Sequence, residues 1–206
     1  MDNVRDLKDL QLDALREVAN IGAGHAATAL SQMTNRTIMI SIPEVNITPL
    51  EEVGELLGQP DDVIAAVLMH MLGDLTGRTL VVFPEAAARG LCDMLLRRPE
   101  GTTTEFGPME QSGLKEAGNI LSSAYMNALS DFMGMMLIPS VPGLVIDLCG
   151  AVLTTTYLNF GHDRDYVFCI ETEFRFLDTG KQLHGHFLLL PDLASLRAIF
   201  DAIRLT

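Results

Sequence analysis

The chain has 206 residues, of which 48% are hydrophobic and only 20% are charged, so it can bury a core as one domain or as two small fused repeats. Its formal net charge of -13 excludes the dense positive surface that nucleic-acid binding needs, and it argues against docking on anionic membranes. A protein is therefore the expected binding partner.

No segment of the sequence is typical of a membrane span or of a secretion signal. The longest apolar run, Val63 to Met69, is far shorter than the ~20 residues that a spanning helix needs, and the N-terminal residues are acidic and amphipathic. The three cysteines, Cys92, Cys149 and Cys169, lie far apart among apolar residues, which favours reduced thiols over a disulfide framework. We therefore expect a soluble protein of the cytoplasm.

The first half of the chain predicts a long helix, a strand region and a second helix. Residues 6–34 have the apolar period of a helix, and residues 36–47 have the pattern of a strand that contains a proline. A polar connection at residues 50–60 leads to two apolar strands, Val63–Leu72 and Thr79–Phe83, whose link GDLTG suits a turn. Pro84 then opens a helix through Leu96.

The second half repeats this order. A helix at residues 108–133 and a proline-bearing segment at 136–146 precede residues 148–160, whose type the pattern leaves open. Two strands, Tyr166–Phe176 and Leu183–Leu190, and a closing helix follow. We predict an α+β fold with pseudo-twofold symmetry, in which long helices cover one face of an antiparallel sheet. The chain is expected to be one domain, 1–206, built from repeats at about 6–104 and 105–206 that are not stable alone.

An offset of 99 residues aligns the two long helices and superimposes a stripe of polar residues. At about 100° per residue the stripe falls on one face, apart from the apolar face of each helix. Its members are Asp13, Glu17, Asn20 and Gly24 in the first copy and Ser112, Glu116, Asn119 and Ser123 in the second. Pro43 and Pro142 follow the two asparagines at the same distance. A solvated helix face explains one such stripe, but two matching copies favour a functional role.

The doubled pattern, Asp/Ser-x3-Glu-x2-Asn-x22-Pro, resembles the signature of the CheC-type phosphatases of bacterial chemotaxis, a family that includes CheC, CheX and FliY. The segments EVANIGAGHAATALS, GDLTG and EAGNILSSAYMNALSDFMG are most similar to CheC. The resemblance implies the duplicated CheC-like fold and hydrolysis of the aspartyl phosphate on the response regulator CheY. It also implies the receptor deamidase CheD as a further partner.

Residue roles follow from the same resemblance. Asn20 and Asn119 enter the active site of the regulator and orient the attacking water, while Glu17 and Glu116 pair with the regulator's lysine. An amide suits the first role because it both donates and accepts hydrogen bonds without ionising. The motif is supported by Asp13, Pro43, Ser112 and Pro142. The chain itself is expected to bind no metal or cofactor, since the Mg²⁺ belongs to the regulator.

Other protein classes and other sites fit the sequence less well. A non-catalytic module like the middle domain of the flagellar switch protein FliM has this fold but lacks the Glu and Asn pairs. CheX has one motif and dimerises, whereas two repeats in one chain predict a monomer, and a chain ending at Thr206 leaves no room for the switch domain of FliY. His184 and His186 share one strand face but lack an evident third metal ligand. His25 departs from the small polar residue expected there.

Two glycines within the first helix, Gly22 and Gly24, cost about 1 kcal/mol each relative to alanine. Tight helix packing or the close approach of a partner accounts for such a cost, and packing is the commoner reason.

Overall fold

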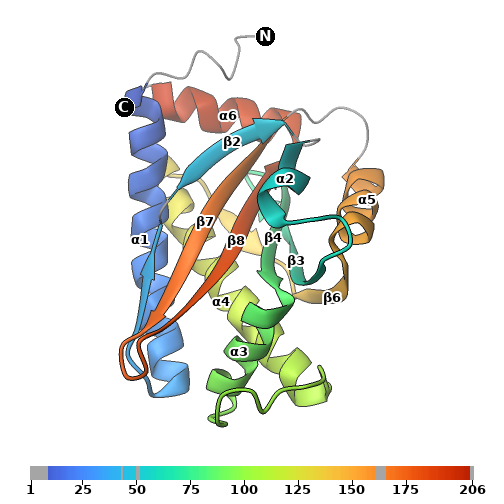
Figure 1. Ribbon diagram of the computed structural model, residues 1–206. Coiled ribbons are helices and arrows are strands. Elements are labelled where there is room, and N and C mark those ends of the chain that lie inside the picture. Colours follow the sequence, from blue (N-terminus) through green and yellow to red (C-terminus); the bar gives the residue numbers. More distant parts are fainter. Residues whose placement is uncertain (1–8, 43, 50–51, 161–165, 205–206) are drawn as a thin grey trace.

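The fold is one antiparallel sheet with helices on both of its faces, as Figure 1 shows for the computed structural model. The structure describes residues 9–42, 44–49, 52–160 and 166–204. The first half contains α1 (Asp9–Thr34), β1 (Ile38–Ser41), β2 (Val45–Pro49), α2 (Val53–Leu57), β3 (Val63–Gly73), β4 (Gly77–Pro84) and α3 (Glu85–Leu95). The second contains α4 (Pro108–Met133), β5 (Leu137–Pro139), β6 (Gly143–Leu148), α5 (Cys149–Phe160), β7 (Tyr166–Phe176), β8 (Lys181–Pro191) and α6 (Leu193–Arg204).

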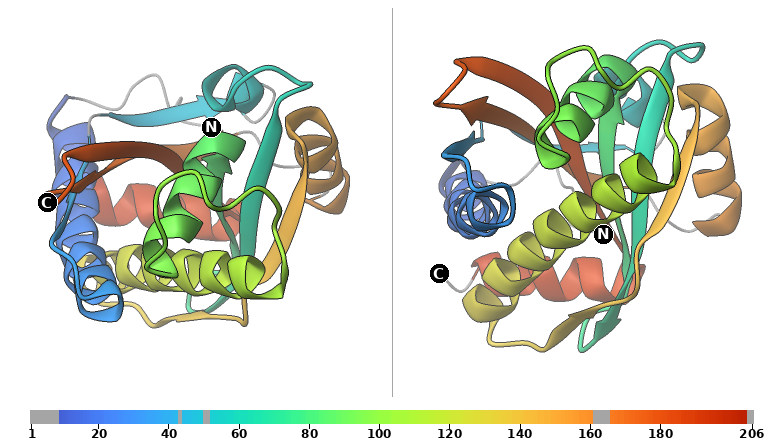
Figure 2. Two further views of the ribbon diagram at one scale, coloured as in Figure 1. Left: turned by 60° about the horizontal axis from the view of Figure 1, so that its bottom comes forward. Right: turned by 90° about the horizontal axis from the view of Figure 1, so that it is seen from below.

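The two long helices are equal in length and equivalent in position. Both α1 and α4 have 26 residues, and the offset of 99 residues carries each end of α1 onto the matching end of α4. Pro108 begins α4 with a preset backbone angle, and Gly134 ends it at φ 64°, which a side chain disfavours. The helices run in different directions across the sheet (Figure 2).

The strands are exchanged between the two halves. The sheet has the order β1-β7-β8-β4-β3-β5, with β2 also paired to β7 and β6 also paired to β3. The edge strands of the first half therefore pair with β7 of the second, and those of the second half pair with β3 of the first. At the centre, β4 and β8 meet antiparallel, with Val82 opposite His186.

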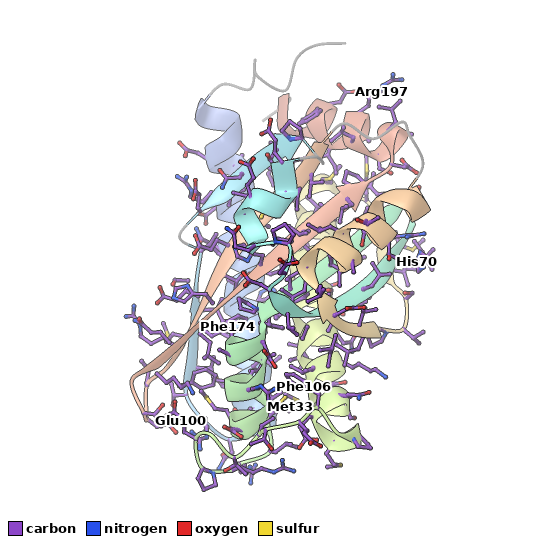
Figure 3. All side chains as sticks on the ribbon, turned by 45° about the vertical axis from the view of Figure 1, so that its right-hand side comes forward. Met33, His70, Glu100, Phe106, Phe174 and Arg197 are labelled. Atoms are coloured by element: carbon purple, nitrogen blue, oxygen red, sulfur yellow. The ribbon has the colours of Figure 1, made fainter. Side chains whose placement is uncertain are left out.

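Two cores lie on opposite sides of the sheet. The larger core packs α1, α3, α4 and α6 against one face, and the smaller core packs α2 and α5 against the other. Strand β3 serves both cores, because Ala65 and Val67 point to the first while Ile64 and Ala66 point to the second. This two-sided burial explains the continuous apolar run at Val63–Met69. In Figure 3, Phe174 lies inside the molecule, whereas Glu100 and Arg197 lie at its surface.

The structure corrects two expectations from the sequence and assigns one segment that the sequence pattern left open. Helices cover both sheet faces rather than one, because α2 and α5 supply a second apolar layer. The segment 36–47 forms two strands, β1 and β2, instead of one. Residues 149–160, which the pattern left open, are the helix α5. The hairpin of β3 and β4, the helix α3 and the mixed helix and antiparallel-sheet class are confirmed.

Candidate functional site

The first polar stripe lies on the exposed face of α1. Asp13, Glu17, Asn20 and Gly24 are all exposed, while the core face of the same helix is buried through Leu15, Val18, Ala19, Ala23, Ala26 and Leu30. Residues three and four apart on a helix are neighbours, with Cβ atoms about 5–6 Å apart, so Glu17 and Asn20 present adjacent polar groups. The motif is thus separate from the core that supports it.

The second stripe lies on α4 and is more enclosed. Ser112 and Glu116 are exposed, whereas Asn119 and Ser123 are half-buried. The core face of this helix is buried through Leu114, Ala117, Gly118, Leu121 and Tyr125. The motif prolines are less informative: Pro142 is half-buried between β5 and β6, and Pro43 lies outside the described residues.

Close packing holds the two helices in place. A Cβ atom on Gly22 would lie 2.6 Å from Tyr125 Cδ1 and 3.0 Å from its Cα, so a side chain at residue 22 would separate α1 from α4. A Cβ atom on Gly118 would lie 2.6 Å from Val67 on β3. Gly24 is different, since a Cβ there meets nothing within 4 Å. Packing therefore explains Gly22 but leaves the exposed Gly24 unexplained by contacts among the described residues.

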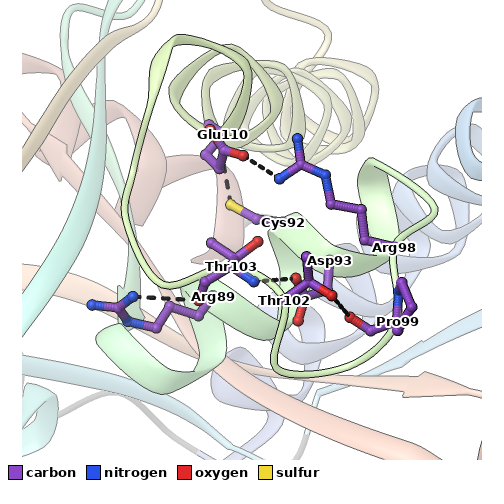
Figure 4. A network of polar contacts seen from close by, with 8 residues as sticks. All are labelled: Arg89, Cys92, Asp93, Arg98, Pro99, Thr102, Thr103 and Glu110. Carbon is purple, nitrogen blue, oxygen red and sulfur yellow. Dashed lines mark hydrogen bonds and ion pairs between the residues drawn. The ribbon is translucent and has the colours of Figure 1, made fainter.

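The link between the repeats fixes the start of α4 (Figure 4). The buried Asp93 accepts hydrogen bonds from the backbone N–H groups of Gly101 at 2.7 Å and Thr103 at 2.8 Å. Burial by itself raises the pKa of Asp93, but the hydrogen bonds from Thr103 and Gly101 outweigh it and lower this pKa below its usual value. Arg98 also pairs with Glu110 in the first turn of α4.

The charges beside the two Glu and Asn pairs differ. Arg16, beside the first stripe, forms an ion pair with Asp13 at 3.5 Å. Lys115 stands at the equivalent position beside the second stripe, where Ser112 replaces the aspartate. Neither basic residue is part of the motif, so the sequence pattern did not single them out. The same offset of 99 residues that found the asparagines relates them.

The remaining candidate groups are Ser122 and the two histidines of β8. Ser122 is buried and accepts a hydrogen bond from Thr79 Oγ1 at 3.2 Å, which is a core contact and not the setting of a nucleophile. His184 Nδ1 lies 3.7 Å from Glu171 Oε1, and burial lowers the pKa of the neighbouring His186. Among the described residues, no three His, Cys, Asp or Glu side chains are grouped so as to hold a metal ion.

The cysteines are free and buried. Burial raises the pKa of Cys92 to about 12 and that of Cys169 to about 12, so both remain protonated thiols at neutral pH. No helix within the described ranges is both long and apolar enough to cross a membrane. The exposed chemistry that the two stripes offer is therefore amide and carboxylate chemistry.

Comparison with known proteins matches the two segments that contain these helices. A model of the CheC-like family matches residues 10–47 and 109–146, which are the two segments that carry the stripes. The CheY-P phosphatase CheC of Bacillus subtilis (strain 168) is 33% identical over 199 residues, covering 96% of this chain and 95% of that protein.

Solved structures share the fold. FliY of Thermotoga maritima has a TM-score of 0.80 at 20% identity and covers 97% of this chain and 98% of that chain. The FliM middle domain from H. pylori has a TM-score of 0.70 at 14% identity, over 95% and 99% of the two chains. Because CheC of Bacillus subtilis is 33% identical and is matched over nearly its full length, the chain belongs to the CheC-like family.

Proposed function

We propose that the chain is a protein phosphatase that hydrolyses the aspartyl phosphate of phosphorylated CheY. The observation that carries the proposal is the Glu and Asn pair, presented twice on exposed or half-exposed faces of equivalent helices. Similarity over 96% of the chain to a protein named as a CheY-P phosphatase supports the same activity.

The chemistry asked of this chain is positioning. The side-chain oxygen of Asn20 or Asn119 accepts a hydrogen bond from a water, and the amide N–H₂ group holds the acyl phosphate side of the site. The water oxygen attacks phosphorus in line, the bond from phosphorus to the acyl oxygen breaks, and the regulator's aspartate leaves as a carboxylate. Fixing a water in this geometry lowers the barrier because its freedom is lost before the reaction.

The glutamates serve docking. Glu17 and Glu116 are exposed carboxylates one helical turn before the asparagines, where they can pair with a cation of the regulator. The Mg²⁺ that neutralises the phosphoryl group belongs to the regulator in this proposal. Asp13, Ser112, Pro43 and Pro142 support the motif.

Phosphate release from phosphorylated CheY of the same organism tests the proposal. Asn20→Ala combined with Asn119→Ala should lower kcat by about 10²-fold or more while binding changes little, because an interaction made in the transition state acts on kcat. Glu17→Ala combined with Glu116→Ala should also weaken binding, since a carboxylate that pairs with the partner acts in the ground state. Asn127→Ala, an exposed asparagine of α4 outside the motif, is the matched control.

A second role rests on the likeness of the fold to the FliM middle domain, namely a module that binds partners without catalysis. Unchanged turnover in the double asparagine variant would favour this role over the phosphatase.

The proposal extends to partners and setting. It describes a monomer in the cytoplasm that receives phosphorylated CheY and also binds CheD. Co-purification of this chain with CheD, followed by light scattering of each component alone, tests both statements. A stable dimer of this chain would contradict the monomeric state, and a lack of association would contradict the binding of CheD.

A further inference from the structure

A basic residue directly precedes the glutamate of each polar stripe, and the Glu and Asn pairs do not account for it. The offset of 99 residues that aligns α1 with α4 also aligns Arg16 with Lys115. The chain has 14 Lys and Arg residues against 27 Asp and Glu residues, so basic residues are scarce. A cation at the same position in both copies therefore needs a physical reason.

The fold makes little use of the charges of these two residues, although the side chain of Lys115 is half-buried. Residues directly adjacent on a helix do not face each other, so Arg16 and Lys115 are not held by the neighbouring glutamates. Arg16 is paired with Asp13 at 3.5 Å, but the side chains are 50% and 67% exposed, and such a pair contributes only about 0–1 kcal/mol. Lys115 forms no ion pair with any residue in the described part of the chain.

The geometry places each cation beside the candidate site. Arg16 is four residues before Asn20, and Lys115 is four residues before Asn119, which puts each pair on one helix face. Long side chains on a helix lean toward its N-terminus, and the contact of Arg16 with Asp13 follows this direction. The charged groups therefore lie at the N-terminal rim of each stripe, while the asparagines lie at the centre.

We propose that Arg16 and Lys115 are docking residues that attract and orient an anionic group of the regulator, and that Asp13 weakens this attraction at the first site. The inference rests on the proposed function, because it concerns the same two sites. The partner's anion is the phosphoryl group or a carboxylate close to it. A chain with a net charge of -13 repels such a group in general, so a local cation has most effect where the anion must enter.

The two sites should differ in their affinity for the regulator, because the charges beside them differ. The first stripe sets two carboxylates, Asp13 and Glu17, beside one guanidinium, whereas the second sets Glu116 alone beside Lys115. The second site should therefore bind the regulator more tightly at low salt, and added salt should reduce the difference because exposed charges are screened. The residue that sets the difference is Asp13 in one copy and Ser112 in the other.

Reciprocal exchange of that residue is the direct test. In an Asn119→Ala background, which leaves the first site, Asp13→Ser should lower KM about two- to five-fold and Arg16→Gln should raise it by a similar factor. In an Asn20→Ala background, which leaves the second site, Ser112→Asp and Lys115→Gln should each raise KM by this factor. In every case kcat should change little, and Lys115→Arg should keep the affinity of the parent.

A control variant and a second readout accompany the kinetics. Arg175→Gln makes the same change in net charge on the opposite face of the sheet and should leave KM as it was. Affinity is also measured for CheY and for CheY activated with beryllofluoride, at low and high salt. A charge effect confined to the activated regulator identifies the phosphoryl group as the anion, and an equal effect on both identifies a carboxylate.

The outcomes separate the inference from the function on which it rests. If the parent protein releases phosphate but the exchanged residues change affinity no more than Arg175→Gln does, the docking role is wrong. Effects that appear in kcat instead of KM would overturn it as well. If no variant and no parent releases phosphate, the proposed function fails, while the affinities still decide whether the two cations recognise an anionic partner.

Discussion

Gly22 and Gly24, which are separated by one residue on α1, are in different surroundings. Gly22 is held at the crossing with α4, whereas Gly24 is exposed with open space where a side chain would stand. In the second copy the residues at these positions are Leu121, which is buried, and Ser123, which is half-buried. Packing within the described residues therefore accounts for Gly22 but not for Gly24, whose position would be open to a partner at the proposed first site.

Gly24→Ala should raise the melting temperature and lower activity at the first site. Alanine is favoured over glycine in an exposed helix interior by about 1 kcal/mol, which corresponds to roughly 2–4 °C in a chain of this size. Thermal melts and phosphate release in the Asn119→Ala background check the two effects. A stabilised variant with full activity would show that no partner uses the open space.

Gly22→Ala is the matched comparison. Its Cβ would approach Tyr125 to 2.6 Å, so the two helices must move apart, and overpacking of this kind costs about 1–3 kcal/mol. The melting temperature should therefore fall. Equal melting temperatures for the two glycine variants would contradict the packing described here.

The thiols should resist alkylation under native conditions. Cys92, Cys149 and Cys169 are at most 2% exposed, and burial raises the pKa of each, so little thiolate is present. Mass spectrometry after treatment with iodoacetamide should find unmodified protein, with full labelling once the chain is unfolded. Rapid labelling of folded protein with loss of activity would assign a thiol to function.

At the scale of elements, the start of α4 depends on the link held by Asp93. Asp93→Asn should lower stability at pH 7 by about 1–3 kcal/mol, because an amide N–H₂ group then faces a backbone donor where a carboxylate oxygen accepted its bond. The exposed Asp61→Asn is the control.

The effect should depend on pH in one direction. The folded pKa of Asp93 lies below its ordinary value of about 3.9, so its contribution is complete above that pH and is lost as the pH falls through the folded pKa. The difference in melting temperature between the native chain and Asp93→Asn should therefore be constant from pH 7 to about pH 5 and should narrow below about pH 4. A difference that grows on acidification would mean that Asp93 is not the ionised acceptor.

Most elements could be predicted because their patterns are local. The 26-residue helices follow from apolar period and from Pro108 and Gly134 at the ends of α4. Helix α5 was left open because its sequence, CGAVLTTTYLNF, contains a β-branched run typical of strands, and only its packing of Val152 and Leu153 on the second core makes it helical.

The candidate site was also predictable only in part, because some of its features depend on packing between distant elements and not on local pattern. Exposure of Glu17, Asn20 and Glu116 follows from helical spacing, and the structure places all three on the surface. The greater enclosure of Asn119 depends on contacts between elements that are distant in sequence. The contact of Arg16 with Asp13 could have been read from their spacing of three residues.

At the scale of the whole molecule, the two halves depend on each other for their sheet. Expressed separately, residues 1–104 and 105–206 should each lack a cooperative melting transition, since β3 and β7 each find their edge partners in the other half. Mixing them should restore one transition and phosphate release, measured by circular dichroism and by the CheY assay. A half that folds and melts cooperatively alone would contradict the proposal of a single domain.

This exchange of strands could not be predicted from the sequence. Repeat detection shows that two copies exist, but strands paired within a copy and strands exchanged between copies have the same apolar pattern. Pairs such as Phe83 with Phe174, whose ring centroids are 5.8 Å apart, join the halves through contacts that no local pattern contains.

The exchanged strands also bear on how the chain folds as it is made. Ile38 pairs with Phe176, and Val45 pairs with Ile170, so the first strands to leave the ribosome have no partner until β7 is synthesised. At about 5–20 residues per second this wait lasts on the order of ten seconds. Unpaired strand edges and the apolar run of β3 are open to wrong association during that time. Yield in a cell should therefore rise when translation is faster through residues 50–166 or when a chaperone covers the nascent first half.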